Sequence, residues 1–354
     1  MTTLLRVTAA EVAFPVRRGG RKVTVRALDG ADLEVQAGET LAIVGESGSG
    51  KSTLARALLK LIDLTAGDIE FDGESIAAMK GRDFRPLRAR LQMVFQDPYS
   101  SLNPSLRIGT NIEEPLRVHT RMSGRERAAR VAELLAQVGL PADSADRYPD
   151  EFSGGQRQRI AIARALALEP DVIVCDEAVS ALDVSTQNQV LALLRDLRTQ
   201  RGLTYVFISH DLAVVRSIAD RIAVMYLGRV VEEGPTERVY SAPAHPYTRL
   251  LLGAVPVPDP ARRRRRTTVA LSGELPDPAN PPSGCTFRTR CPFAMAVCAE
   301  EAPAATRVDG GGSVRCHLQT SGPHLGGRPL LDLVPVHGLI AGDPTDPTTG
   351  GTPE

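Results

Sequence analysis

The chain contains 354 residues, and its 42 Lys and Arg balance 42 Asp and Glu, so the formal net charge is zero. This balance argues against a general binder of nucleic acid. With 42% hydrophobic and 24% charged residues, the composition excludes wholesale disorder and suits about two folded domains. No run approaches the roughly 18 apolar residues of a membrane-spanning helix, and the start lacks a secretion signal pattern, so we expect the chain to stay in the cytosol.

Short apolar runs alternate with helical patterns over residues 1–253. Leu41–Val44 predicts a buried strand, and Ser52–Leu61 predicts the helix that follows it. Further strands are predicted at Leu91–Phe95, Val172–Cys175, Thr204–Ile208 and Arg221–Met225. This alternation indicates an α/β domain. Residues 98–168 show helical patterns without a clear strand, which predicts an inserted helical subdomain.

The sequence after the first predicted strand matches the phosphate-binding pattern G-x-x-x-x-G-K-[ST]. The pattern and the residue after it comprise Gly45, Glu46, Ser47, Gly48, Ser49, Gly50, Lys51, Ser52 and Thr53. In such a loop, backbone N–H groups surround phosphate oxygens, Lys51 reaches the β and γ phosphates, and Ser52 is a Mg²⁺ ligand. The alternative is a chance glycine-rich turn, but a strand before the loop and a helix after it favour a phosphate site.

Two carboxylates follow the predicted strand Val172–Cys175. They belong to Asp176 and Glu177, at the strand end where ligands of open α/β sheets bind. Asp176 is predicted to hold Mg²⁺, directly or through water, and Glu177 to polarise the attacking water in phosphoryl transfer. The alternative for this pair alone is an acidic first turn of a helix.

A third motif decides between these alternatives. Ser153, Gly154, Gly155 and Gln156 precede a helical pattern, and two glycines at a helix start expose backbone N–H groups to an anion. With the two motifs above, the chain resembles the ATP-binding subunits of ABC transporters, whose signature is Ser-Gly-Gly-Gln. The resemblance implies a P-loop NTPase fold, ATP and Mg²⁺ as ligands, and ATP hydrolysis. In the family, the signature binds the γ phosphate held by the opposite subunit.

The resemblance implies roles for four further residues. Gln96 is similar to the glutamine that touches the metal beside the helical subdomain. Ser180–Asp183 is similar to the loop that crosses the dimer interface, which assigns Asp183 to the nucleotide site. His210 is similar to the switch histidine that contacts the γ phosphate, and Phe14 is the candidate for the aromatic residue that stacks on adenine. The implied catalytic residues are Glu177, His210 and Lys51, and Gln96 joins Ser52 and Asp176 as a metal ligand.

Three stretches resemble the subfamily that energises dipeptide and oligopeptide import: Leu91–Pro104, His245–Leu252 and Asn280–Cys285. Because each motif occurs once and a complete family site joins two chains, the resemblance implies a second ATPase subunit, which in this subfamily is a related chain. It also implies two transmembrane permease subunits near Gln96, an extracytoplasmic substrate-binding protein that acts indirectly, and a peripheral location on the cytoplasmic face of the cell membrane. Nickel or glutathione as cargo, and a soluble non-transport ATPase, remain alternatives.

Four of the five cysteines lie in residues 271–320, which we interpret as a Cys-rich C-terminal extension. Cys285, Cys291, Cys298 and Cys316 are separated by 5, 6 and 17 residues, a spacing unlike a C-x-x-C zinc ribbon or a local ferredoxin run. Four thiolates suit zinc or a 4Fe–4S cluster, and related segments carry such a cluster in some family members. Reduced thiols without metal are the alternative. Cys175 lies apart and is expected to be a small core residue.

Residues 254–270 change in character, with several prolines and five consecutive arginines, Arg262–Arg266. This composition predicts a linker between the ATP-binding domain and the extension. The arginine run is interpreted as a solvated charge run, with anionic lipid or nucleic acid as the alternative. Residues 321–354 form a tail, and its last part, Ala341–Glu354, has little to bury, so we expect disorder at that end.

Overall fold

The computed structural model describes residues 2–254 and 275–320. The predicted linker at residues 254–270 lies outside the described residues except for its first residue, and the predicted tail at 321–354 lies outside them entirely. None of the helices in the described ranges has the length and apolar character that crossing a lipid bilayer requires.

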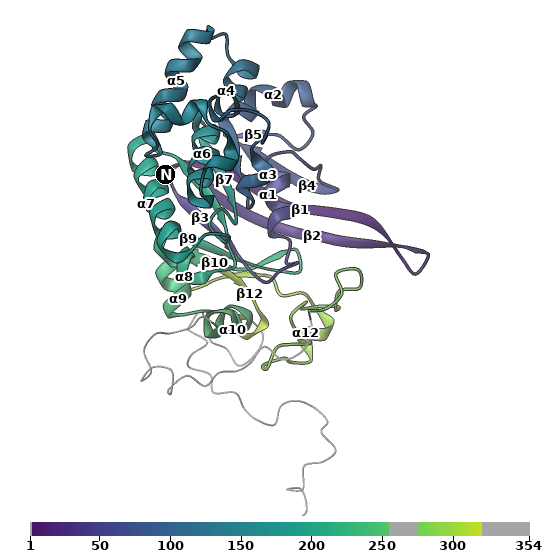
Figure 1. Ribbon diagram of the computed structural model, residues 1–354. Coiled ribbons are helices and arrows are strands. Elements are labelled where there is room, and N and C mark those ends of the chain that lie inside the picture. The colour runs from purple at the N-terminus through teal and green to yellow at the C-terminus, as the bar shows by residue number, and fades with distance from the viewer. Residues whose placement is uncertain (1, 255–274, 321–354) are drawn as a thin grey trace, which may run out of the picture.

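The nucleotide-binding part is built on an eight-stranded sheet with the order β11-β12-β10-β9-β3-β8-β7-β6 (Figure 1). Strands β9, β3, β8, β7 and β6 are parallel, and β10, β12 and β11 continue the sheet antiparallel. The bounds are β3 Thr40–Val44, β6 Leu91–Val94, β7 Val172–Asp176, β8 Thr204–Ile208, β9 Arg221–Tyr226, β10 Arg229–Pro235, β11 Ala305–Arg307 and β12 Ser313–Arg315. All five residues of β3, of β7 and of β8 are buried, which explains why these strands read as unbroken apolar runs.

All five strands predicted in the α/β core are therefore confirmed to within one residue at each end. The predicted helix Ser52–Leu61 ends earlier, because α1 spans Lys51–Leu58. Lys60 has a φ of 48°, in the left-handed region that commonly ends an α-helix. Its ammonium donates to the Ala77 carbonyl at 2.7 Å.

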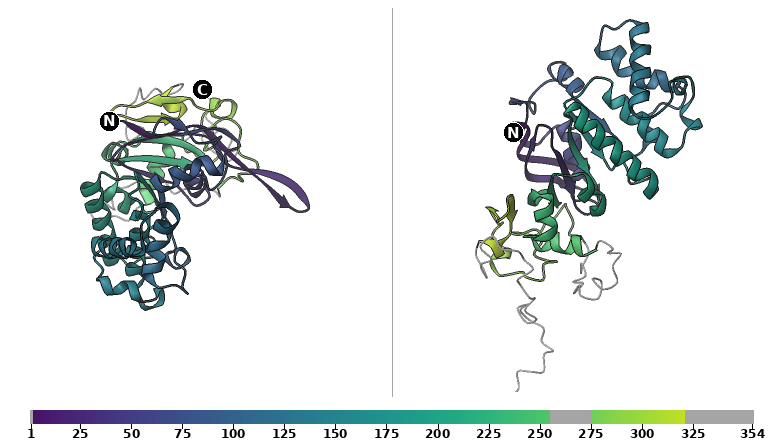
Figure 2. Two further views of the ribbon diagram at one scale, coloured as in Figure 1. Left: turned by 90° about the horizontal axis from the view of Figure 1, so that it is seen from above. Right: turned by 90° about the vertical axis from the view of Figure 1, so that its left-hand side faces the viewer.

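A second sheet, with the order β2-β1-β4-β5, was not predicted. Its bounds are β1 Thr3–Arg18, β2 Arg21–Gln36, β4 Ala66–Phe71 and β5 Glu74–Ser75. Figure 2 shows the hairpin of β1 and β2 reaching away from the body of the molecule. Register shifts interrupt the β1–β2 pairing, so the side-chain alternation that marks a strand in sequence is broken several times. Apolar residues of this sheet pack with those of β3 and α1 in one cluster.

The predicted helical subdomain is present between β6 and β7 (Figure 1). Its elements are α3 Pro98–Ser101, α4 Ile108–His119, α5 Gly124–Gln137, the short 3₁₀ turns Ala142–Asp146 and Pro149–Glu151, and α6 Gly154–Leu166. Its apolar residues share a buried cluster with β7, β8 and the following helix α7 Val184–Arg201. The subdomain is thus packed on the sheet that carries the carboxylates.

Helix α2 Gly81–Arg90 leads directly into the edge strand β6, beside the helical subdomain (Figure 1). The remaining described elements lie toward the opposite end of the sheet: α8 Leu212–Ile218, α9 Thr236–Ser241, α10 Pro246–Ala254, α12 Val297–Glu300 and the 3₁₀ turn His317–Gln319. The Cys-rich segment lies beside α10 and β10, and its strand β12 pairs with β10 (Figure 1). A buried cluster joins α8, α10 and Phe287 to the core strands, so this segment shares its packing with the ATP-binding core.

Candidate functional site

The predicted phosphate loop connects the end of β3 to the start of α1. Gly45 and Gly50 have φ angles of 154° and 105°, which residues with side chains rarely adopt. A Cβ on Gly45 would lie 2.3 Å from the Met225 carbonyl oxygen, and one on Gly50 would lie 2.5 Å from that of Ala27. The loop is therefore pressed against two backbone segments, which explains the glycines at both positions.

Lys51, the first residue of α1, folds back over the loop. Its Nζ donates to the carbonyl oxygens of Gly45 and Glu46, each at 2.8 Å. Burial lowers the pKa of the Lys51 ammonium, whereas the carboxylates of Glu177, Asp176 and Glu46 raise it. The ammonium thus lies within the loop and close to the acidic residues. This position suits a cation that binds phosphate next to a metal ion.

Ser52 and Asp176 meet, although they are 124 positions apart in sequence. The Ser52 hydroxyl donates to Asp176 Oδ1 at 3.2 Å, from the first turn of α1 to the end of β7. Burial raises the pKa of Asp176, the Ser52 hydrogen bond lowers it, and the neighbouring Glu177 raises it. A buried hydroxyl–carboxylate pair supplies hard oxygen donors of the kind that Mg²⁺ prefers.

Glu177 lies between two other predicted site residues. Gln96 Nε2 donates to Glu177 Oε2 at 2.9 Å, and His210 Nδ1 lies 3.3 Å from Glu177 Oε1. Glu177 has a φ of 48°, and its backbone N–H donates to the Ile208 carbonyl at 3.0 Å, which fixes the residue at the edge of the sheet. Residues that follow β6, β7 and β8 thereby converge on one carboxylate.

The signature residues begin α6. Ser153 is the N-cap: its Oγ accepts from the Gln156 backbone N–H at 3.3 Å, and the Gln156 side chain accepts from the Ser153 N–H at 2.9 Å. This capping box fixes the start of the helix. A Cβ on Gly155 would lie 2.1 Å from Thr186 Cγ2, so α6 and α7 are in close contact there. Asp183 caps α7 and accepts from the backbone N–H and the hydroxyl of Thr186, at 3.0 and 2.7 Å.

The remaining predicted residues of the nucleotide site are placed as follows. Ser47, Gly48 and Ser49 lie in the loop, where the Ser49 N–H donates to the Glu46 carbonyl at 3.2 Å, and Thr53 lies in the first turn of α1. Phe14 lies in β1 opposite Val25 on β2, with 40% of its surface exposed, so its ring is accessible.

The four C-terminal cysteines come from separate turns and the short helix α12, and the backbone carbonyl oxygen of Cys298 accepts a hydrogen bond from the Cys285 N–H at 2.8 Å. Burial raises the pKa of Cys285, raises that of Cys291 to about 12, and raises that of Cys316, with a smaller contribution from neighbouring cysteines in each case. Across residues 2–254 and 275–320, however, no group of three or more His, Cys, Asp or Glu is placed to hold a metal ion. Cys175 is fully buried in β7, as expected.

Two residues in contact with the phosphate loop were not predicted. Tyr247 Oη accepts from the Glu46 N–H at 2.8 Å, and the Arg290 guanidinium donates to both carboxylate oxygens of Glu46, at 2.9 and 3.1 Å. Tyr247 belongs to the stretch His245–Leu252, whose resemblance to a subfamily was the available signal. Arg290 lies 244 positions from its partner, so no local pattern marks it.

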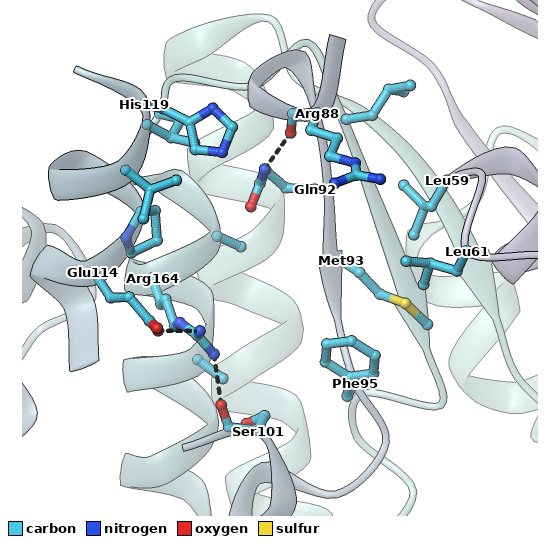
Figure 3. A pocket seen from close by; sticks show the side chains of 16 residues that line it. Leu59, Leu61, Arg88, Gln92, Met93, Phe95, Ser101, Glu114, His119 and Arg164 are labelled. Atoms are coloured by element: carbon cyan, nitrogen blue, oxygen red, sulfur yellow. Dashed lines mark hydrogen bonds and ion pairs between the residues drawn. The ribbon is translucent and has the colours of Figure 1, made fainter. Parts of the chain in front are cut away.

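A groove of about 320 Å³ separates the helical subdomain from the core near Gln96 (Figure 3). Apolar side chains line its core side, including Leu59, Leu61, Met93 and Phe95. On the opposite side, Arg164 of α6 donates to the Glu114 carboxylate at 2.7 Å and to the Ser101 carbonyl at 2.6 Å. Leu61 and Phe95 are 54% and 43% exposed, so the groove presents apolar surface to a partner.

Comparisons with known proteins identify the family of this chain. The family described as "ABC transporter" matches residues 28–180, and "Oligopeptide/dipeptide transporter, C-terminal region" matches residues 231–298. A probable peptide ABC transporter ATP-binding protein of Sinorhizobium fredii is 51% identical, over 89% of this chain and 90% of its own length. The oligopeptide transport ATP-binding protein OppF of Escherichia coli is 51% identical, over 85% of this chain and 92% of its own length. The chain belongs to the ABC transporter ATP-binding proteins.

Solved structures show the same ABC ATPase fold. The ATP-binding cassette MJ0796, a dimer in a post-hydrolysis state with ADP and Pi, is 32% identical with a TM-score of 0.59, over 66% of this chain and 99% of that one. The protein cbiO1 of Clostridium perfringens, part of the ABC transporter complex cbiONQ, is 28% identical with a TM-score of 0.60, over 68% of this chain and 92% of that one. This chain is therefore an ABC ATPase, an enzyme that binds ATP with Mg²⁺ and hydrolyses it.

Proposed function

We propose that this ABC ATPase energises the import of dipeptides or oligopeptides through a membrane transporter. The observation that carries the ATPase part is the convergence of Gln96 and His210 on Glu177, beside the Ser52–Asp176 pair. The peptide part is supported by the matched C-terminal region and by the printed names of the relatives.

The residues divide the work of phosphoryl transfer. Lys51 releases the loop carbonyls and pairs with the β and γ phosphates, while the N–H groups of residues 48–52 bind phosphate oxygens. Ser52, Gln96 and Asp176 would hold Mg²⁺, which would supply positive charge to neutralise the negative charge that develops on the phosphates. Glu177 accepts a proton from the attacking water, and His210 orients the Glu177 carboxylate. Phe14 would stack on adenine.

A second ATPase subunit completes the site. The loop at residues 45–52 and the signature at Ser153–Gln156 each occur once in the chain, and they belong to different subdomains. We propose that the signature and Asp183 face the nucleotide of the opposite subunit, which in this subfamily is a related chain. Two N–H groups at the start of α6 and its positive helix end suit the γ phosphate of that nucleotide.

The groove beside Gln96 is proposed to receive a coupling helix from a permease subunit. Its apolar core wall and its ionic opposite wall suit an amphipathic helix, which would place one face on each. Because β6 leads from this groove to Gln96, an inserted helix can change the position of the Gln96 amide relative to Glu177. In this proposal the subunit lies peripherally on the cytoplasmic face of the membrane, and a substrate-binding protein acts on the other side.

The cofactor proposal at Cys285, Cys291, Cys298 and Cys316 goes beyond Mg²⁺ and ATP. Support comes from the pKa values of the Cys285, Cys291 and Cys316 thiols, which burial raises most and neighbouring cysteines raise further, as expected of thiols that lie near one another. Four thiolates suit a 4Fe–4S cluster or zinc. The described residues do not present these thiols as a ready ligand group. Iron, sulfide and zinc analysis of anaerobically purified protein separates a cluster, zinc and free thiols.

Purification of the chain with its membrane partners tests the main proposal. We expect two permeases and a second ATPase subunit to co-purify, and we expect peptide-loaded binding protein to stimulate ATP hydrolysis in proteoliposomes. If nickel or glutathione stimulates hydrolysis instead of peptide, the proposed cargo is wrong, whereas the assignment as an importer ATPase stands. Recovery of the chain without any membrane protein, together with full ATPase activity, would favour the soluble non-transport alternative.

A further inference from the structure

Every polar group of Glu46 has a partner in this structure. Its carbonyl oxygen accepts from Lys51 Nζ at 2.8 Å, and its N–H donates to Tyr247 Oη at 2.8 Å. Its carboxylate accepts two hydrogen bonds from Arg290, at 2.9 and 3.1 Å. Its carbonyl oxygen also accepts from the Ser49 N–H at 3.2 Å. Glu46 is the second residue of the phosphate loop, and two of its four partners, Tyr247 and Arg290, lie outside the loop and its helix. The loop is thus held from the C-terminal side of the chain.

Arg290 is well placed to hold a loop in one position. Its side chain is only 6% exposed, and that of Glu46 is 24% exposed, so water screens the pair weakly. The paired contacts of a guanidinium with both oxygens of a carboxylate restrict orientation as well as distance. The Arg290 guanidinium also lies 5.9 Å from the centre of the Tyr226 ring.

The segment that carries Arg290 is itself anchored beside the loop. Phe287, three residues earlier, is buried and packs edge-on against Tyr226 with ring centres 5.2 Å apart. Tyr226 in turn contacts Tyr247, the acceptor for the Glu46 N–H, at 4.7 Å between ring centres. Leu275 lies near the loop as well, because its Cδ2 would be 3.6 Å from a Cβ built on Gly48. The C-terminal segment therefore approaches the loop at two points and contacts it through Arg290.

We propose that Arg290 is a positioning residue for the phosphate loop, and that it acts on nucleotide affinity through the carboxylate of Glu46. By fixing residue 46, Arg290 fixes the carbonyls that hold the Lys51 ammonium and the direction from which the loop enters α1. Without Arg290 the loop can adopt arrangements that bind phosphate poorly. Because only a fraction of the molecules then has the binding-competent loop, the apparent affinity for nucleotide falls by that fraction. This inference rests on the proposed role of residues 45–52 as the phosphate loop.

The test measures the Kd for Mg²⁺–ATP and Mg²⁺–ADP by equilibrium titration of the full chain. The variants are Arg290→Met, Arg290→Lys, Glu46→Gln and the double variant Arg290→Met with Glu46→Gln. Arg288→Met is the matched control, because Arg288 lies two residues away and donates to Ser283 in its own segment. Lys51→Ala reports separately on the phosphate loop.

We expect Arg290→Met to raise the Kd for both nucleotides about tenfold, which corresponds to about 1.4 kcal/mol, while Arg288→Met leaves it unchanged. Arg290→Lys should lose less, since it keeps the charge without the paired contacts. The double variant should be no weaker than the worse single variant, because both changes break the same interaction. In the assembled transporter, the same change should raise KM for ATP and leave kcat nearly constant.

Three results would overturn the inference: a wild-type Kd for Arg290→Met in a folded chain, a double variant whose losses add, or an equal loss in Arg288→Met. If Arg290→Met does not fold, Arg290→Lys and Glu46→Gln decide the question, and wild-type affinity in both counts against the inference. Unchanged ATP affinity in Lys51→Ala would instead contradict the phosphate-loop assignment on which the inference rests.

Discussion

The amide nitrogen of Gln96 lies 2.9 Å from a carboxylate oxygen of Glu177, so a residue beside the helical subdomain directly contacts the proposed general base. The distance links two regions that are 81 positions apart in sequence. Any movement of the segment after β6 therefore changes the surroundings of the Glu177 carboxylate. Gln96 directly follows Phe95, which lines the groove of Figure 3, so this contact connects the groove to the nucleotide site.

Glu177→Gln should bind ATP with nearly wild-type affinity and hydrolyse it about a hundredfold or more slowly, because an amide cannot accept the proton of the attacking water. Phosphate release in the assembled ATPase pair measures hydrolysis, and titration with Mg²⁺–ATP measures binding. Full hydrolytic activity in this variant would remove Glu177 from the role of general base.

Lys51→Ala should weaken ATP binding by about tenfold or more, since it removes a charged hydrogen-bond donor to the phosphates. Equilibrium titration of the full chain measures the loss. Lys60→Ala is a suitable control, because Lys60 donates to the Ala77 carbonyl and to Asp63, outside the loop. Equal losses in both lysine variants would argue for a general charge effect.

Gly155→Ala should destabilise the contact between α6 and α7, because the new Cβ would lie 2.1 Å from Thr186 Cγ2. Overpacking of this kind costs about 1–3 kcal/mol in the free energy of unfolding. Adding Thr186→Ser removes the clashing methyl group and keeps a hydroxyl for Asp183, so the double variant should recover most of the loss. Urea unfolding measures all three proteins, and a double variant as unstable as Gly155→Ala contradicts the contact.

His245→Asn should make stability less dependent on pH below neutrality. Burial lowers the pKa of His245 to about 3, so between its usual pKa of about 6.5 and pH 5 only the unfolded state gains a proton there. Stability is therefore full above that range and falls as pH decreases, by up to about 1.4 kcal/mol per pH unit. Asparagine offers an acceptor to the Tyr247 N–H, as His245 Nδ1 does at 3.0 Å, without taking a proton. The check is the free energy of unfolding of both proteins at pH 7.0, 6.0 and 5.0. If it falls with pH as steeply in His245→Asn as in the wild type, His245 is not the source of the pH dependence.

Leu61→Glu should reduce association with the permeases and leave ATP binding intact, because the side chain lies on the exposed apolar wall of the groove and away from the loop. Leu61→Met preserves the apolar surface and serves as the control. Co-purification with tagged permease measures association. Equal recovery of permease with Leu61→Glu and Leu61→Met would argue that the coupling helix docks elsewhere.

The grouping of the proposed site residues was predictable from the sequence because these residues follow strand ends. Asp176, Glu177 and His210 each come directly after or close to a buried apolar run, and parallel strands deliver their carboxyl ends to the same edge. The helical subdomain was equally visible, because α5 carries a long amphipathic pattern and a Ser123–Glu126 capping box. These signals are local in sequence, so they indicate both the type of element and where it begins.

The hairpin of β1 and β2 and the contact between Arg290 and Glu46 were not predictable in this way. Register shifts within the hairpin interrupt the alternation that a strand shows in sequence. The ion pair joins positions that are far apart, and nothing around Arg290 distinguishes it from other arginines of the chain. Side chains that act through tertiary contact leave no periodic pattern, so the structure alone identified them.

The pairing of β12 with β10 has a practical consequence for anyone who shortens this chain. Glu232 and Glu233 of β10 lie opposite Val314 and Ser313, so a cut that removes residues after 254 would leave β10 as an unpaired edge strand with open backbone hydrogen-bonding groups. Such edges recruit other strands and promote aggregation. An isolated cassette prepared for crystallisation or binding studies should therefore extend to residue 320, and inclusion bodies from a shorter fragment would not mean that the cassette itself is unstable.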